Sequence, residues 1–426
     1  MLAARHAQWE VVWFLLRETT ADATRVCFAG KSAAHFAAES GHLETLSLIV
    51  MEGGVNVNAK DKDGISAVML AAQSGHKGAV EWLVSEACAN ANATTKTGKT
   101  ALMFAAQNGH LDVVDWLVNT AKGNANSANA FGRTALMLAA QEGHKQVVEF
   151  LIASGDSDIN AGDQDGRTAL MLVALQGRKD LVELLVKGGA DASAVMKGGW
   201  SAIAFAARFG RLEVVRWLVV EGRVDACAAI DDGRTVLMLA ASKGHMDVVR
   251  WLVKEAGMDC RAALHDGWNA VMAAAEHGHK EVVEFLVREG GTDVIEAMSD
   301  GRMAVMSAAW KGHLSVVQWL VKEGGADADA KDSNGFTALM SAAANGHLDV
   351  VRFLSSEPTV DVAATTRDGR SALMVAAYYG HKEVAALLLE EARHGTCAWS
   401  GKEGAVLSAA AQGRTEVVEW LVREGG

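Results

Sequence analysis

Histidines are the residues of this sequence that could most readily carry chemistry, because imidazole binds zinc and acts as a general base near neutral pH. Those that directly follow a glycine recur along the chain: His42, His76, His110, His144, His245, His279, His313, His347 and His381. Most consecutive members are 34 residues apart. If each interval forms one unit of a helical stack, neighbouring imidazoles lie about 10 Å apart, too far to share a zinc ion held at about 2 Å from each ligand. We therefore expect these histidines to be structural.

One local group, Glu276-His277-Gly278-His279, places two histidines beside a carboxylate. A tetrahedral zinc site needs further ligands, so surface residues are the favoured interpretation. The sequence contains no H-E-x-x-H, G-x-S-x-G, Walker or kinase motif. We predict no catalytic residue, no metal site and no cofactor, and therefore no enzymatic activity.

The elements that position these histidines repeat from end to end. One glycine marks the period: Gly30, Gly64, Gly98, Gly132, Gly166, Gly199, Gly233, Gly267, Gly301, Gly335 and Gly369. The steps are 34 residues, with one of 33 between Gly166 and Gly199. A fixed period of this length is typical of a solenoid.

The unit that starts at Gly132 shows how each repeat should fold. Thr134 stands where a helix N-cap belongs, and residues 135–140 form a short apolar helix that should end at Gly143. His144 then begins a second helix, whose apolar residues recur at helical spacing. Neither helix can bury its apolar face alone, so stability depends on stacking between units.

The repeated pattern D-G-R-T-A-L-M-x-A-A-x-x-G-H-x-x-V-V-x-x-L-V resembles the ankyrin repeat. It is clearest over residues 165–186, 232–253 and 334–354. The resemblance implies an all-α repeat solenoid of about twelve helix-turn-helix units with hairpin loops. We expect one continuous array over residues 1–426, with a truncated first unit at 1–16, full repeats over 30–388 and a degenerate last unit at 389–426, where Gly404 replaces the N-cap Thr.

The sequence departs from the family pattern within the first helix. The family's T-P-L-H reads here as T-A-L-M, and only His35 keeps the histidine. In the family that imidazole links adjacent turns by hydrogen bonds. We expect the methionines to replace those bonds by packing.

Aromatic residues fall into two groups. One group occupies a single position of the second helix, where we expect core packing or a half-covered outer ridge: Trp82, Trp116, Trp217, Trp251, Trp319 and Trp420, with Phe150, Phe285 and Phe353.

The second group lies at positions that the resemblance places on the concave face, at the hairpins and the ends of the first helices. Its members are Trp200, Phe209, Trp268, Trp310, Phe336, Tyr378 and Tyr379. Exposed Trp and Tyr dominate binding hot spots, so we predict that these residues bind a partner, with Arg234, Arg302 and Arg370 at the rim. The alternatives are that the aromatics cover one another, and that the arginines only pair with the aspartates that precede the turn glycines.

Composition narrows the class of partner. The net charge is −12 at pH 7 and no long basic run occurs, which argues against nucleic acid. The sequence has no apolar stretch of about 18 residues that would insert in a membrane. Its five scattered cysteines favour a reducing, cytoplasmic location.

We therefore interpret the chain as a non-catalytic scaffold that binds a partner protein or peptide on its concave face. An alternative is the recognition arm of a larger enzyme or channel whose working domain lies outside this chain, because the pattern of the terminal units predicts uncapped ends. A third interpretation is an elastic spacer without a specific groove. The sequence does not identify the partner.

Overall fold

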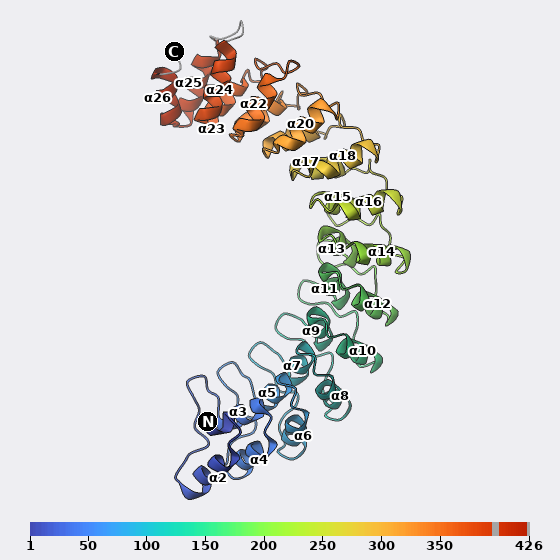
Figure 1. The fold of residues 1–426 in the computed structure, drawn as a ribbon, viewed down its shortest axis with the longest axis vertical. Coiled ribbons are helices and arrows are strands. Elements are labelled where there is room, and N and C mark those ends of the chain that lie inside the picture. Colours follow the sequence, from blue (N-terminus) through green and yellow to red (C-terminus); the bar gives the residue numbers. More distant parts are fainter. Residues whose placement is uncertain (394–399, 424–426) are drawn as a thin grey trace. The chain divides into compact units, whose positions relative to one another are not determined.

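The computed structural model describes residues 1–393 and 400–423, so Cys397 and Trp399 lie outside the described part (Figure 1). The chain divides into two compact units. The first comprises Met1–Phe205 with Val220–Val224, and the second comprises Ala206–Val219 with Asp225–Gly426.

The first unit is built from pairs of helices. The chain passes from the first unit to the second within the next pair. The pairs of the first unit are α1 (Leu2–Arg5) and α2 (Trp9–Glu18), α3 (Ala33–Ser40) and α4 (Leu43–Met51), α5 (Ala67–Gln73) and α6 (Lys77–Ser85), α7 (Ala101–Gln107) and α8 (Leu111–Asn119), α9 (Ala135–Glu142) and α10 (Lys145–Ala153), and α11 (Ala169–Gln176) and α12 (Lys179–Lys187). The crossing pair is α13 (Ala202–Arg208) and α14 (Leu212–Val220).

The second unit continues the same alternation of a short first helix and a second helix. Its pairs are α15 (Val236–Ala241) and α16 (Met246–Lys254), α17 (Ala270–Glu276) and α18 (Lys280–Arg288), α19 (Ala304–Trp310) and α20 (Leu314–Lys322), α21 (Ala338–Ala344) and α22 (Leu348–Ser356), α23 (Ala372–Tyr379) and α24 (Lys382–Arg393), and α25 (Ser400–Ala411) and α26 (Thr415–Arg423).

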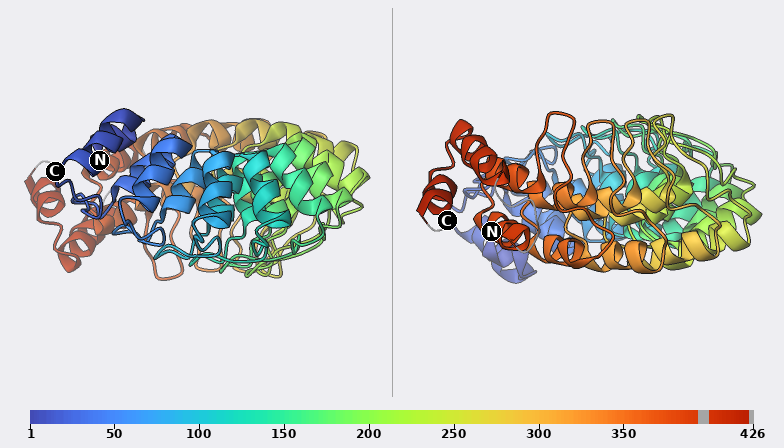
Figure 2. Two further views of the ribbon diagram at one scale, coloured as in Figure 1. Left: turned by 90° about the horizontal axis from the view of Figure 1, so that it is seen from below. Right: turned by 90° about the horizontal axis from the view of Figure 1, so that it is seen from above.

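Two layers of helices run through each unit, and hairpin loops leave them on one side (Figure 2). First helices pack on first helices, as α5 does on α7 and α19 on α21, and second helices pack on second helices, as α6 does on α8. The alanine pair of the first helix, such as Ala105 and Ala106, is completely buried. Small side chains at this contact let neighbouring helices approach closely, which is how an alanine-rich sequence builds a continuous core.

The predicted helix ends are confirmed. The Thr134 hydroxyl oxygen accepts a hydrogen bond from the Met137 N–H at 3.3 Å. Gly143 ends α9 with φ 85°, in the left-handed region that glycine adopts without strain. Helices, turns and isolated antiparallel bridges such as that between Lys60 and Ser66 make up the described residues, so the all-helical prediction is correct.

The methionines that replace the family histidine pack in the core instead of forming its hydrogen bond to the next hairpin, as expected. The His35 Nδ1 atom lies 3.1 Å from the Ser32 nitrogen, and its Nε2 atom lies 3.1 Å from the Ile65 oxygen of the next hairpin. Met103 and Met137, which occupy the same place in other repeats, are buried among apolar side chains. The methionines therefore retain the core contact without the bond to the next hairpin.

The last helix pair differs from the expected arrangement. Gly404 was expected at an N-cap, but it lies inside α25, which begins at Ser400. A Cβ atom at Gly404 would lie 2.1 Å from the Met374 Cε atom. Glycine therefore allows α25 to pack closely on α23.

Candidate functional site

Three of the predicted binding aromatics line one pocket in the second unit. Trp268 and Phe336 follow turn glycines, and Trp310 is the last residue of α19. The pocket has a volume of about 320 Å³ and is also lined by Met298, Met306, Arg302, Glu276, Lys311, Asp332, Ser307 and Ser341. We call it the three-aromatic pocket. Trp310 is 43% exposed, whereas Trp268 and Phe336 are half-buried because they form its walls.

The charged groups around the three-aromatic pocket are already engaged. Lys311 pairs with Glu276 at 3.7 Å. Arg302 donates to Asp300 at 2.7 Å. An Asp332 carboxylate oxygen accepts the Phe336 backbone N–H at 2.8 Å. With these charges satisfied internally, the remaining surface of the pocket suits an apolar side chain better than an ion.

A second pocket adjoins the three-aromatic pocket. It shares Trp268 and Glu276 with the first, has a volume of about 450 Å³, and includes Arg208, Arg234 and Lys243. Arg234 pairs with Asp232 at 2.6 Å, and this hydrogen-bonded contact lowers the pKa of the Asp232 carboxyl. Trp268 thus lines both the three-aromatic pocket and a more polar one.

The other predicted aromatics do not join this cluster. Trp200, in the first unit, packs on Phe205 with ring centroids 5.1 Å apart. Tyr378 contacts Tyr379 edge-on at 5.1 Å, and the Arg370 guanidinium lies 5.2 Å above the Tyr378 ring.

The seven predicted binding aromatics also differ in how far their side chains are exposed. Phe209 and Tyr379 are each 44% exposed. Trp200 and Tyr378 are half-buried, because each packs on a neighbouring ring. Trp200, Trp268, Phe336 and Tyr378 are therefore only partly exposed, whereas Phe209, Trp310 and Tyr379 are exposed.

The geometry of the three arginines agrees with the interpretation that they pair with the aspartates before the turn glycines. Arg234, Arg302 and Arg370 each pair with the aspartate two residues earlier, at 2.6, 2.7 and 2.9 Å. All three pairs are partly or largely solvent-exposed, so each contributes little to folding.

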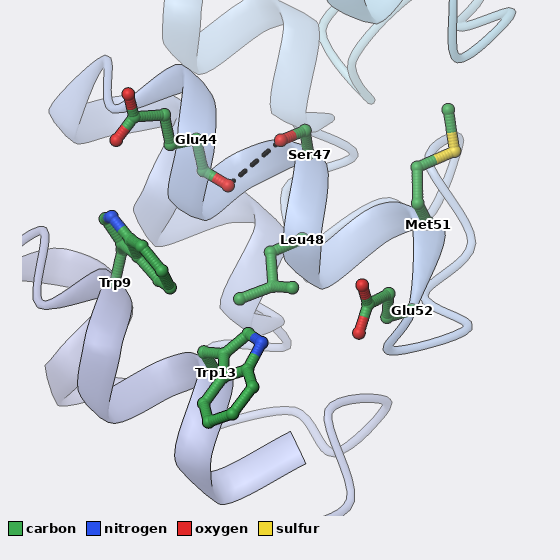
Figure 3. Close-up of a pocket in the computed structure, with 7 residues that line it drawn as sticks. All are labelled: Trp9, Trp13, Glu44, Ser47, Leu48, Met51 and Glu52. Carbon is green, nitrogen blue, oxygen red and sulfur yellow. Dashed lines mark hydrogen bonds between the residues drawn. The ribbon is translucent and has the colours of Figure 1, made fainter. Parts of the chain in front are cut away.

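Sequence reasoning missed a second aromatic groove, on the second helices of the first unit. Trp9 and Trp13 of α2 face Leu48 of α4, with Glu44 at one end and Met51 and Glu52 at the other (Figure 3). We call this the outer groove; its volume is about 430 Å³. The available signal was Trp13, which stands at a position that carries Glu81, Glu149 and other polar residues in later repeats.

The comparison with family models decides what these repeats are. The model described as ankyrin repeats in three copies matches in overlapping segments over residues 1–94, 68–163, 154–229, 220–298, 291–366 and 358–426. The chain belongs to the ankyrin-repeat family. A search of curated proteins found no significant match. Ankyrin repeats are generally protein–protein interaction modules.

The recurring histidines have a structural place in this ankyrin array. The Nε2 atoms of His76, His110 and His144 lie 3.1, 2.9 and 2.9 Å from carbonyl oxygens near the end of the first helix of the preceding repeat. Because a carbonyl can only accept, Nε2 carries the proton and caps an otherwise unsatisfied group. The structural interpretation of these histidines is confirmed.

The two histidines of the Glu276–His279 cluster also contact backbone carbonyl oxygens. The His277 Nδ1 atom lies 2.9 Å from the Ala273 oxygen, and the His279 Nε2 atom lies 3.2 Å from the Ser242 oxygen. Among the residues that the structure describes, no group of three His, Cys, Asp or Glu could hold a metal ion. Within the same residues, no helix is long and apolar enough to cross a membrane.

The aromatics of the second helix are buried or half-covered, as expected. Phe285 and Trp319 are buried. The Arg250 and Arg288 guanidiniums of the respective preceding repeats lie 5.5 Å above their rings. These cation–π contacts cover the two rings.

Proposed function

We propose that this ankyrin array is a scaffold that binds a partner protein or peptide on its hairpin side, with the three-aromatic pocket as the anchor site. The observation that carries the proposal is the convergence of Trp268, Trp310 and Phe336 on one cavity. A volume of about 320 Å³ is at the small end for ligand pockets. It suits one or two apolar side chains of a protein segment.

The chemistry of the pocket supports a protein partner. Trp is enriched at interface hot spots because it buries a large area at a low cost in side-chain entropy. Met298 and Met306 add flexible, polarizable walls that adapt to different apolar side chains. Arg302 lies at the edge, where its guanidinium can exchange its contact with Asp300 for one with a partner carboxylate.

The test compares three forms of the full chain in affinity capture from lysate followed by mass spectrometry. These are the wild type, the Trp268→Ala/Trp310→Ala variant and a Phe131→Ala control. Phe131 is a 60% exposed aromatic beside another turn glycine, in the first unit. Helix content by circular dichroism should be the same in all three.

We expect proteins that the wild type and the control retain and that the double variant loses. Each tryptophan should contribute on the order of 2 kcal/mol to the affinity for a purified partner. If the double variant binds every partner of the wild type with unchanged affinity, the assignment of the anchor site is wrong.

A further inference from the structure

The outer groove holds a tryptophan at a position that is otherwise polar. Counting along the repeats from Trp13, the same place on the second helix is taken by polar or charged residues, apart from Ala386: Ser47, Glu81, Asp115, Glu149, Glu183, Arg216, Arg250, Glu284, Gln318, Arg352 and Glu419. A place that faces water in this way does not need an indole for folding. Trp13 therefore needs a separate explanation.

The two tryptophans of the outer groove lie on one face of α2. Their spacing of four residues puts both indoles on the same side of the helix. Trp9 is 43% exposed and Trp13 is 37% exposed. Figure 3 shows the Leu48 side chain between the two rings, Glu44 at the Trp9 end and Glu52 at the Trp13 end.

One end of the groove already holds a cation. The Arg17 guanidinium lies 5.6 Å from the centroid of the Trp13 ring. Its Nε and Nη2 atoms donate to the two carboxylate oxygens of Glu52, each at 2.7 Å. A guanidinium thus lies over an indole and pairs bidentately with a glutamate, and the contact with Arg17 lowers the pKa of Glu52.

The other end presents the same two groups without the cation. Trp9 offers an exposed indole, and Glu44 lies beside it on α4. Among the described residues, no Lys, Arg or His lies within ion-pair distance of the Glu44 carboxylate; its backbone oxygen accepts from the Ser47 hydroxyl at 2.9 Å. We propose that the outer groove binds an arginine side chain from a basic segment of a partner protein, between Trp9 and Glu44.

Charge around the groove supports a basic occupant. Helices α2 and α4, together with the C-cap residue of α4, contain four glutamates and one arginine: Glu10, Glu18, Glu44 and Glu52, and Arg17. The whole chain has a net charge of −12. This field attracts a basic segment and disfavours an acidic one. Leu48 and Met51 add apolar surface for the neighbouring side chains of the segment. This site is separate from the three-aromatic pocket and does not depend on it.

The test uses the full chain labelled with ¹⁵N in its tryptophan indoles. A blocked heptapeptide with two arginines separated by leucine is titrated in, beside the same peptide with citrulline in place of arginine. Citrulline keeps the shape of the side chain but removes its charge. Substitutions Trp9→Phe and Trp13→Phe assign the two indole signals. We expect the arginine peptide to shift the Trp9 signal and to bind at least about fivefold more tightly than the citrulline peptide.

Glu44→Gln should lower the affinity for the arginine peptide by about fivefold and leave the affinity for the citrulline peptide unchanged. This exposed substitution tests the site without removing a packed ring, and Trp9→Ala provides the second test. The matched control is Glu149→Gln. Glu149 lines a comparable groove between α8 and α10 that includes Asp112, Asp115 and Phe150 but no tryptophan.

Several outcomes would overturn the proposal. One is equal affinity for the arginine and citrulline peptides. Another is an equal loss of affinity in Glu149→Gln. A third is no shift of the Trp9 signal at millimolar peptide. A shift that follows protein concentration instead of peptide would show that a second copy of the chain occupies the groove.

Discussion

The Nε2 atom of His144 lies 2.9 Å from the backbone oxygen of Gln107, 37 residues earlier in the chain. Gln107 is the last residue of α7, where helical carbonyls have no partner within the helix. The recurring histidines after His42 make the same contact, so each caps the first helix of the preceding repeat. A motif that looks local in the sequence makes its main contact between repeats.

Removal of this cap should destabilise the array. We expect His144→Ala to lower the free energy of unfolding by about 1–2 kcal/mol, because it leaves the Gln107 carbonyl without its donor and removes the packing of the ring. Urea unfolding followed by tryptophan fluorescence measures the change. His42→Ala is the control, since the His42 ring has no hydrogen-bond partner among the described residues. Equal losses in both variants would contradict this role.

Gly109 should be intolerant of a side chain for two separable reasons. Its φ is 78°, and a Cβ atom would lie 2.4 Å from the His144 Nδ1 atom. We expect Gly109→Ala to cost more than the roughly 1 kcal/mol that the left-handed backbone alone would require. In the His144→Ala background the steric part should disappear. A double-mutant cycle measures this coupling, and strictly additive effects would show that the ring does not pack on Gly109.

His35 should make stability sensitive to mild acid. Burial lowers the pKa of His35, so the unfolded chain binds a proton more readily than the folded chain. The free energy of unfolding should then fall as the pH drops below about 6.5. His35→Met introduces the residue found here in other repeats and should remove this part of the pH dependence. Parallel stability curves for the two proteins between pH 7 and pH 5 would contradict the prediction.

Cysteine reactivity should separate the buried thiol from the exposed ones. Burial raises the pKa of the Cys260 thiol, and its side chain is 3% exposed, whereas Cys88 and Cys227 are exposed. Because the thiolate is the reactive form, iodoacetamide should modify Cys260 at least about tenfold more slowly. Peptide mapping over time measures the rates. Addition of urea should remove the difference, and equal rates in the folded protein would show that Cys260 is accessible.

The helix pattern was predictable because its signals are local. Thr134 as an N-cap and Gly143 as a left-handed terminator act within a few residues of the helix they bound. The same reasoning failed at Gly404. There, α25 begins at Ser400, and Gly404 lies inside it in close contact with Met374 of the preceding repeat.

The candidate sites were predictable only in part. Counting the repeat places Trp268, Trp310 and Phe336 on one side of the stack, and these three residues line one pocket. The same count gives Trp200 a similar position, but its ring packs on Phe205. The orientation of a side chain depends on its neighbours, which the repeat count does not describe. Trp9 and Trp13 were missed because the first unit was treated as a truncated copy.

Period, capping residues and apolar spacing were thus enough to predict the family, the helix pairs and the structural role of the histidines. These features depend on backbone propensities and on a stacking rule that every repeat obeys. The pockets required the three-dimensional arrangement, because each joins residues from two or more repeats. Whether an aromatic ring lines a cavity, stacks on a neighbour or meets a cation is set by side-chain packing within and between repeats. The contact of Arg17 with Trp13 and Glu52 is one example.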